Sequence, residues 1–148
     1  MRRLVGVLRQ QDDGVDLAPR PSLRHLGALI DRVRDAGLPV DVSIDGLPYD
    51  LPTGVDVSAF RIVQEALTNT LAHAGPATAS VVIRYSEDRI DLEISDTGTR
   101  AGRWRTDGHG LVGMRERVAL YDGLLETGPR PGGGFVVKAR LPLGPGTS

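Results

Sequence analysis

The sequence predicts an α/β two-layer sandwich, with helices packed on one face of a mixed, mostly antiparallel sheet. Three observations support this fold class. A long helical pattern ends near Ala74, two alternating segments at 80–86 and 89–95 flank a short polar turn, and a third alternating segment lies at 135–143. Helices and strands mixed in this order bury their apolar faces by packing in two layers.

The composition is that of one ordinary globular domain. The chain has 148 residues, of which 40% are hydrophobic and 25% charged. Its 18 Lys and Arg residues balance 19 Asp and Glu residues, so the net charge of −1 gives no general attraction to nucleic acid or to an anionic membrane. With no cysteine, disulfides and thiolate metal sites are excluded. We predict a cytoplasmic chain that touches neither nucleic acid nor membrane and is a monomer in isolation.

The first third of the chain is predicted to hold a helix end, a connector, a second helix and a strand. Residues 1–19 carry helical spacing without an N-cap, followed by a polar, Pro-containing linker, so we interpret them as the end of a helix from a longer protein. Residues 22–37 have apolar residues on one helical face and end at Gly37. Residues 38–46 alternate as a strand does.

The long central helix is predicted to begin at Thr53, as N-cap, with Asp56 completing a weak capping box. Glu65 and Asn69 lie one turn apart, roughly opposite the apolar stripe, beside a mixed face. Spacing alone favours a solvated helix face. The alternative is the wall of a ligand cleft, in which an asparagine oxygen suits Mg²⁺ bridging phosphates and a glutamate acts as a base. The stripe itself consists of Phe60, Val63, Leu67, Leu71 and Ala74.

The last third combines a glycine-rich loop with a helix and a closing strand. Asp96 ends an alternating strand just before Gly98, where it could accept a hydrogen bond from a ligand amine or simply form a turn. A glycine-flanked loop enters the helix predicted at 111–123, and the N–H groups of such a helix start favour phosphate. Residues 124–134 are predicted to turn, one or two strands are expected after the last helix, and the tail at 144–148 is predicted to be disordered.

Three segments together resemble a known family: FRIVQEALTNTLAHAG at 60–75, ISDTG at 94–98, and the segment at 108–143 that begins GHGLVGMRERV. They are similar to the ATP-binding catalytic domain of bacterial sensor histidine kinases, in the branch paired with helix-turn-helix response regulators. This domain belongs to the GHKL superfamily and has the Bergerat-type ATP-binding fold. The resemblance spans roughly residues 20–143, and residues 1–19 resemble the end of the dimerisation and phosphotransfer domain.

The resemblance implies roles for individual residues. Asn69 resembles the asparagine that binds Mg²⁺ between the ATP phosphates, and Glu65 resembles the glutamate that activates the attacking group. Asp96 resembles the aspartate that takes the adenine amino group, with Gly98 allowing close approach. Residues 99–109 correspond to the ATP lid. The other implied nucleotide-binding residues are His73, which could contact phosphate or face water, and Gly108, His109, Gly110, Leu111 and Gly113.

Three positions depart from the family pattern. Arg100 replaces the second glycine that often follows the adenine-binding aspartate, Ala72 replaces a lysine that often precedes the HA pair, and Phe135 replaces a threonine that often follows the glycine run. These departures concern nucleotide affinity and rate more than the fold. Trp104, in the implied lid, is a candidate partner contact.

The implied activity is transfer of the γ-phosphoryl group of Mg·ATP to a histidine on the dimerisation domain, and from there to a response regulator. None of the three histidines of this chain, His25, His73 and His109, is followed by the acidic residue that this branch places after its acceptor. The acceptor is therefore expected outside this chain. Two alternatives stay open: a GHKL serine kinase or ATPase, and a nucleotide-binding regulatory module without catalysis.

Overall fold

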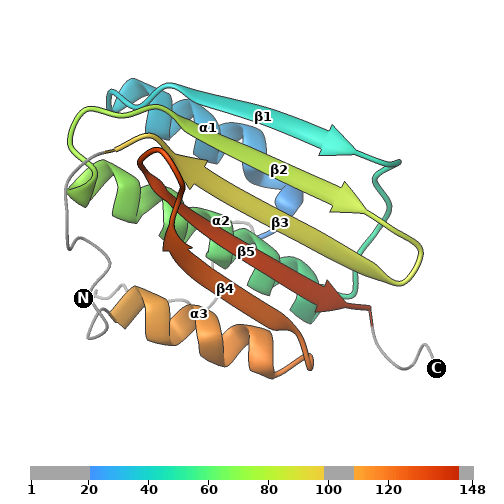
Figure 1. Ribbon diagram of the computed structural model, residues 1–148. Coiled ribbons are helices and arrows are strands. Elements are labelled where there is room, and N and C mark those ends of the chain that lie inside the picture. Colours follow the sequence, from blue (N-terminus) through green and yellow to red (C-terminus); the bar gives the residue numbers. More distant parts are fainter. Residues whose placement is uncertain (1–20, 99–108, 144–148) are drawn as a thin grey trace, which may run out of the picture.

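A computed structural model describes residues 21–98 and 109–143 of the chain (Figure 1). The predictions for residues 1–19, for the lid and its Trp104, for Gly108, and for the tail at 144–148 lie outside these ranges. The described elements are a 3₁₀ turn η1 (Leu23–His25), then α1 (Leu26–Asp35), β1 (Val40–Asp45), α2 (Thr53–His73), β2 (Ala79–Tyr85), β3 (Arg89–Asp96), α3 (His109–Ala119), β4 (Leu124–Pro129) and β5 (Phe135–Pro142).

The five strands form one sheet in the order β1-β2-β3-β5-β4. The outer pair β1 and β2 is parallel, and the other three pairs are antiparallel. All three α-helices lie on the same face of the sheet, with α2 behind its centre, α1 near β1 and α3 near β4 (Figure 1). The two-layer sandwich predicted from the sequence is therefore confirmed.

The core lies between α2 and the inner face of the sheet. On β3 the even positions Ile90, Leu92, Ile94 and Asp96 are buried, while the odd positions are half-buried on the other face. This alternation places a carboxylate at the end of an apolar run that faces the helices. The largest buried side chains of the core come from the centre of the sheet and from α2 and α3: Ile62, Val63, Leu67, Val81, Ile83, Ile90, Leu92, Met114, Val137 and Leu141.

The central helix is buried more widely than its predicted stripe. Ile62 and Ala66, which the sequence placed on the mixed far side, are 0% and 1% exposed. Leu71, predicted to lie in the apolar stripe, is 39% exposed instead. Because α2 packs on β3, β2 and β5 and also contacts α1 and α3, apolar residues occupy most of its circumference. The single apolar stripe predicted from the sequence was therefore too narrow a description of the buried surface of α2.

The last helix ends earlier than predicted, and two strands follow it, one of the two numbers that the sequence left open. The helix predicted at 111–123 ends at Ala119, and the chain then turns through Asp122, at φ 58°, into Gly123. The segment after Gly123, predicted as turn, forms the edge strand β4, in which Gly128 and Pro129 still pair with β5. An edge strand tolerates Pro because one side of its backbone faces away from the sheet.

The predicted capping box at Thr53 was also wrong. Pro52 is the N-cap of α2, and the Asp56 carboxylate instead reaches the start of η1. Its Oδ2 accepts a hydrogen bond from the Ser22 hydroxyl at 2.6 Å, and its Oδ1 accepts one from the backbone N–H of Leu23 at 2.8 Å. Asp56 therefore joins the first turns of two segments that are far apart in the sequence.

We expect Asp56→Ala to lower the free energy of unfolding by about 1.5–3 kcal/mol, the usual range for hydrogen bonds to a charged group. Asp50→Ala is the matched control, because its ion pair with Arg24 joins two side chains that are 89% and 73% exposed. Such a pair contributes less than about 1 kcal/mol. Urea denaturation measures both values, and equal losses in the two variants would contradict the role given to Asp56.

Candidate nucleotide site

Helix α2 carries the first group of predicted site residues along one side. Glu65 and Asn69 are both half-buried, one turn apart, and His73 is exposed in the last turn. The first two side chains are therefore partly shielded from solvent, and partial burial fits both a solvated helix face and the wall of a cleft. Because these positions are spaced four apart, their side chains project from neighbouring turns of the same side of the helix. Exposure of His73 leaves both of its predicted alternatives open.

The end of β3 supplies the second group. Asp96 is 3% exposed and both of its carboxylate oxygens accept hydrogen bonds. Oδ1 accepts from the backbone N–H of Gly98 at 2.8 Å, and Oδ2 lies 3.1 Å from the Thr70 hydroxyl. A buried carboxylate stays charged most easily when donors surround it. A carboxylate has about four acceptor positions in all, two on each oxygen.

A link between the two groups runs through Thr70. This residue follows Asn69 on α2, is 3% exposed, and contacts Asp96 of β3 through its hydroxyl. Asn69 is therefore next in the sequence to the residue that contacts Asp96. The predicted Mg²⁺ ligand Asn69 and the predicted adenine ligand Asp96 are linked in this way through Thr70.

The turn before β5 closes over the backbone of Asp96. Gly134 has φ +95°, and a Cβ placed on it would lie 1.9 Å from the carbonyl oxygen of Asp96. The same oxygen accepts a hydrogen bond from Arg130 Nη1 at 2.9 Å, and Phe135 is the register partner of Asp96 on β5. The glycine is therefore required by close approach of two backbones and by its positive φ. Arg130 was missed by the sequence analysis, since its partner lies 34 residues away.

Helix α3, which contains Gly110 and Gly113, contacts α2. Its backbone begins at His109 and continues through Gly110 and Leu111. Gly113 is half-buried, and a Cβ there would lie 3.1 Å from Nη1 of Arg117, a flexible group that can move. The N-terminal turn of this helix is the predicted phosphate side of the site.

No group of three or more His, Asp or Glu side chains that could hold a metal ion occurs within residues 21–98 and 109–143. A Mg²⁺ ion does not need such a cluster of carboxylates and histidines. Mg²⁺ is usually bound by one or two protein oxygens together with substrate phosphates and water. The half-buried Asn69 supplies a neutral oxygen of this kind, with Glu65 one turn away.

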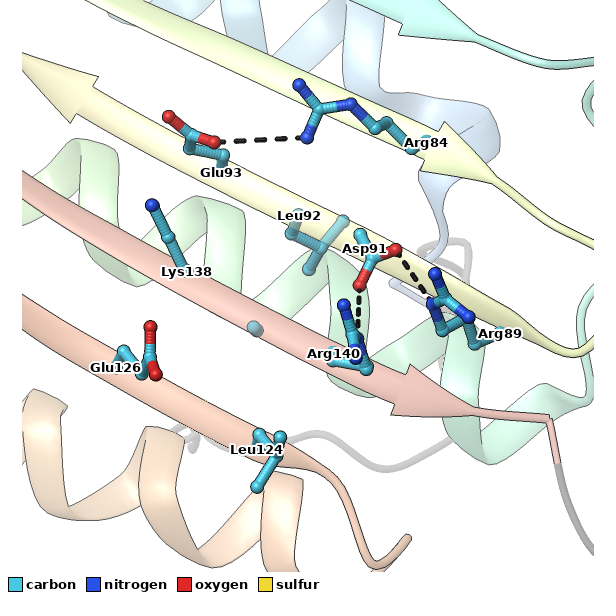
Figure 2. Close-up of a pocket in the computed structure, with 10 residues that line it drawn as sticks. Arg84, Arg89, Asp91, Leu92, Glu93, Leu124, Glu126, Lys138 and Arg140 are labelled. Carbon is cyan, nitrogen blue, oxygen red and sulfur yellow. Dashed lines mark hydrogen bonds and ion pairs between the residues drawn. The ribbon is translucent and has the colours of Figure 1, made fainter.

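The opposite face of the sheet carries a different concavity of about 490 Å³ (Figure 2). Its charged residues form ion pairs, two of them between neighbouring strands and one within β3. Arg140 Nε lies 2.9 Å from Asp91 Oδ1, Arg89 Nε lies 3.1 Å from Asp91 Oδ2, and Arg84 Nη1 lies 3.9 Å from Glu93. This face is separated from Asp96 by the sheet itself, because odd and even positions of β3 point to opposite sides. The predicted site residue Asp96 therefore lies on the helix-covered face, opposite this concavity.

Comparison with known proteins decides the family. Residues 54–145 match the model of the histidine kinase-, DNA gyrase B- and HSP90-like ATPases. The chain belongs to this family. The matched range contains α2, Asp96 and the glycine-rich segments, so the resemblance inferred from the sequence is confirmed together with its fold.

Curated relatives of this ATPase domain are sensor kinases. The domain is 35% identical over 123 residues to the sensor histidine kinase YxjM of Bacillus subtilis (strain 168), covering 82% of this chain and 30% of YxjM. It is 32% identical over 113 residues to the sensor histidine kinase LnrJ of the same strain, covering 76% of this chain and 28% of LnrJ. The chain therefore spans less than a third of the length of these relatives.

Solved structures show the same architecture. A blue-light activated histidine kinase of Erythrobacter litoralis EL346 matches with a TM-score of 0.63 and 26% identity, covering 83% of this chain and 42% of that one. The catalytic domain of the histidine kinase ThkA matches with a TM-score of 0.62 and 15% identity, covering 84% of this chain and 96% of that one. The second match shows the fold alone. Of the helices in the described ranges, none is long and apolar enough to cross a bilayer.

Proposed function

We propose that this chain is the Mg·ATP-binding catalytic domain of a sensor histidine kinase. In this proposal the γ-phosphoryl group passes to a histidine on a dimerisation domain, and a response regulator is the later partner. The observation that carries the proposal is the hydrogen-bonded contact between α2 and the end of β3, which joins the position beside Asn69 to the buried Asp96 carboxylate. Similarity to sensor histidine kinases supports it.

In the proposed site, Asp96 accepts a hydrogen bond from the 6-amino group of adenine. The donors already on its two oxygens, Thr70 and the Gly98 N–H, hold the carboxylate in one orientation. Because this carboxylate is buried, the hydrogen bond from adenine is not weakened by water. Gly98, itself buried, lets the base approach without a side chain in the way.

At the phosphate end, the Asn69 oxygen binds Mg²⁺. A Mg²⁺ ion held there would supply positive charge against the phosphates during transfer. The first turn of α3, with His109, Gly110 and Leu111 and with Gly113 one turn on, directs backbone N–H groups to the phosphates, and Gly108 precedes it in the chain. Glu65 accepts a hydrogen bond from the ring N–H of the incoming imidazole, which makes the opposite ring nitrogen a better nucleophile.

Two features bear on the acceptor. His25, in η1, is exposed, and its follower Leu26 is 7% exposed in the core, so this histidine lacks the acidic neighbour of the branch. His73 is exposed at the C-terminal end of α2, on the helix that carries Asn69. We therefore propose that the acceptor belongs to the dimerisation domain of a longer parent, whose end corresponds to residues 1–19.

A second candidate function is a nucleotide-binding module that performs no transfer. It is favoured by Phe135, which lies opposite Asp96 in the register where the family often has a threonine, and by the exposed Ala72, which supplies no cation to a phosphate. This candidate predicts the same binding of Mg·ATP and differs only in chemistry.

Calorimetric titration of ATP with and without Mg²⁺ tests the binding half of the proposal. We expect saturable binding that is tightened by Mg²⁺, and we expect Asn69→Ala to weaken Mg·ATP binding roughly tenfold or more while leaving metal-free ATP nearly unchanged. Thr68→Ala is the matched control, because Thr68 is an exposed neighbour on the same helix. A metal dependence that survives Asn69→Ala would refute the assignment of the Mg²⁺ ligand.

Phosphotransfer in trans separates the two candidate functions. The chain is incubated with radiolabelled ATP and a separately produced phosphotransfer domain of the same branch. Label that appears on that domain, resists alkali and is lost in acid identifies phosphohistidine and supports the kinase. Acid-stable label identifies a serine kinase instead, and binding without transfer identifies the regulatory module.

A further inference from the structure

The Thr70 hydroxyl occupies a position that needs a functional explanation. It is 3% exposed, on a helix face otherwise occupied by apolar residues such as Ile62 and Ala66. A buried hydroxyl is costly unless it is hydrogen-bonded. Its single proton lies within reach of two acceptors, the backbone carbonyl oxygen of Ala66 and the Asp96 carboxylate, each at 3.1 Å. Bonding to Ala66 alone would satisfy the hydroxyl, so contact with Asp96 is an additional property of the site.

This contact restrains the orientation of the Asp96 side chain. With Oδ1 held by the Gly98 N–H at 2.8 Å and Oδ2 held by Thr70, rotation of the carboxyl group about its terminal bond would break both hydrogen bonds. One restraint comes from the chain just after β3 and the other from α2, so the carboxylate is fixed by two different elements. Preorganised acceptors bind a ligand donor more tightly because less freedom is lost on binding.

The neighbouring strand provides no side-chain hydroxyl at this point. Phe135, opposite Asp96 on β5, has a hydrocarbon side chain that cannot donate a hydrogen bond. Arg130 reaches the main-chain oxygen of Asp96. The Thr70 hydroxyl, in contrast, contacts the Asp96 carboxylate itself.

We infer that Thr70 is a positioning residue that sets the selectivity of this site for adenine, by holding the Asp96 carboxylate toward the 6-amino group. The inference rests on the proposed ATP site and assigns it a determinant on α2. Because Asn69 and Thr70 are consecutive, one helical turn controls both the metal-phosphate end and the base end of the nucleotide. Displacement of α2 would therefore change both ends together.

The test compares ATP with purine riboside triphosphate, which lacks the 6-amino group. Calorimetric titration with Mg²⁺ is carried out on the unmutated chain, Thr70→Val, Thr70→Ser and the exposed control Thr68→Val. We expect Thr70→Val, which keeps the shape but removes the hydroxyl, to weaken ATP binding about five- to tenfold. Binding of the analogue should change less than about twofold, since it makes no bond that Thr70 supports. Thr70→Ser should restore most of the selectivity.

The outcomes separate positioning from stability. Equal weakening of both nucleotides by Thr70→Val would show a merely structural role and overturn the inference, as would unchanged selectivity for ATP. Urea denaturation of each variant shows whether it is folded, and if Thr70→Val does not fold, the ratio of the two affinities in Thr70→Ala serves instead. Failure of the unmutated chain to bind either nucleotide would overturn the proposed function and this inference with it.

Discussion

Replacing Gly134 with alanine is expected to destabilise the domain more than any other substitution considered for its glycine-rich turn. The new Cβ would lie 1.9 Å from the carbonyl oxygen of Asp96 and 2.9 Å from its carbonyl carbon. Both atoms belong to the backbone of a central strand, so neither can move without breaking the β3–β5 pairing. The φ of +95° adds strain of about 1–2 kcal/mol for a residue with a side chain. Together with overpacking, we expect a loss of roughly 2–5 kcal/mol of unfolding free energy.

Two neighbouring glycines separate the two causes. Gly132 and Gly133 also have positive φ, +85° and +116°, but no atom lies within 4 Å of a Cβ placed on either. Alanine at these positions should therefore cost only the backbone strain. Urea denaturation of the three variants measures the difference. Similar losses of unfolding free energy at all three positions would show that Gly134 is needed for its φ alone. They would also show that the start of β5 can move enough to place a side chain beside Asp96.

If Gly134→Ala does not fold, hydrogen exchange on Gly133→Ala and the unmutated chain gives a second measurement. The backbone N–H of Thr97 is bonded to the carbonyl of Thr78 at 3.0 Å, at the same end of the sheet. In Gly133→Ala, the protection of the Thr97 N–H against exchange should stay close to its value in the unmutated chain. The stability of this end is then shown to depend on Gly134 and not on the turn as a whole.

The parts of the fold that were predicted from the sequence are those with a strong local signal. The β2–β3 hairpin was predicted because alternation is strict on both sides of a short polar turn, and Asp96 was placed at a strand end for the same reason. The bounds of β4 were not predicted, and a second strand after the last helix was left open, because Gly128 and Pro129 are typical of turns, whereas an edge strand accepts them.

The parts that were missed depend on distant contacts. Thr53 and Asp56 have the spacing of a capping box, but Asp56 bonds Ser22 and Leu23, which lie more than 30 residues away. Thr70 was not singled out in the sequence, because its partner on β3 is 26 residues further along the chain. Local patterns do not show which distant side chain donates a hydrogen bond to a given carboxylate. The resemblance placed Asn69 and Asp96 in one nucleotide site, whereas the contact through Thr70 became visible only in the structure.

Replacing Asp96 with asparagine should abolish most ATP binding. The amide keeps the shape of the carboxyl group but loses its charge and offers one acceptor oxygen in place of two. The Thr70 hydroxyl can turn its proton to the Ala66 carbonyl and accept from the new NH₂ group. The Gly98 N–H and the adenine amine must then share the single uncharged oxygen. Losing a hydrogen bond to a charged acceptor costs about 1.5–3 kcal/mol, which corresponds to a roughly 10- to 100-fold weaker affinity by calorimetry.

Asp91→Asn is the matched control for this change, because Asp91 lies on the same strand but faces the other side of the sheet, where it pairs with Arg140 and Arg89. Its replacement should leave ATP binding unchanged. Undiminished ATP binding by Asp96→Asn would refute the assignment of Asp96 to the base.

A double-mutant cycle joins Asp96 to Thr70. If Thr70 acts through the carboxylate, Thr70→Val should weaken ATP binding in the unmutated chain but have almost no further effect in Asp96→Asn, since the charge that it positions is gone. Additive losses would show instead that Thr70 and Asp96 affect the nucleotide independently. Because Thr70 follows Asn69 on α2, a non-additive result would place the selection of the base on the same helical turn as the proposed Mg²⁺ ligand.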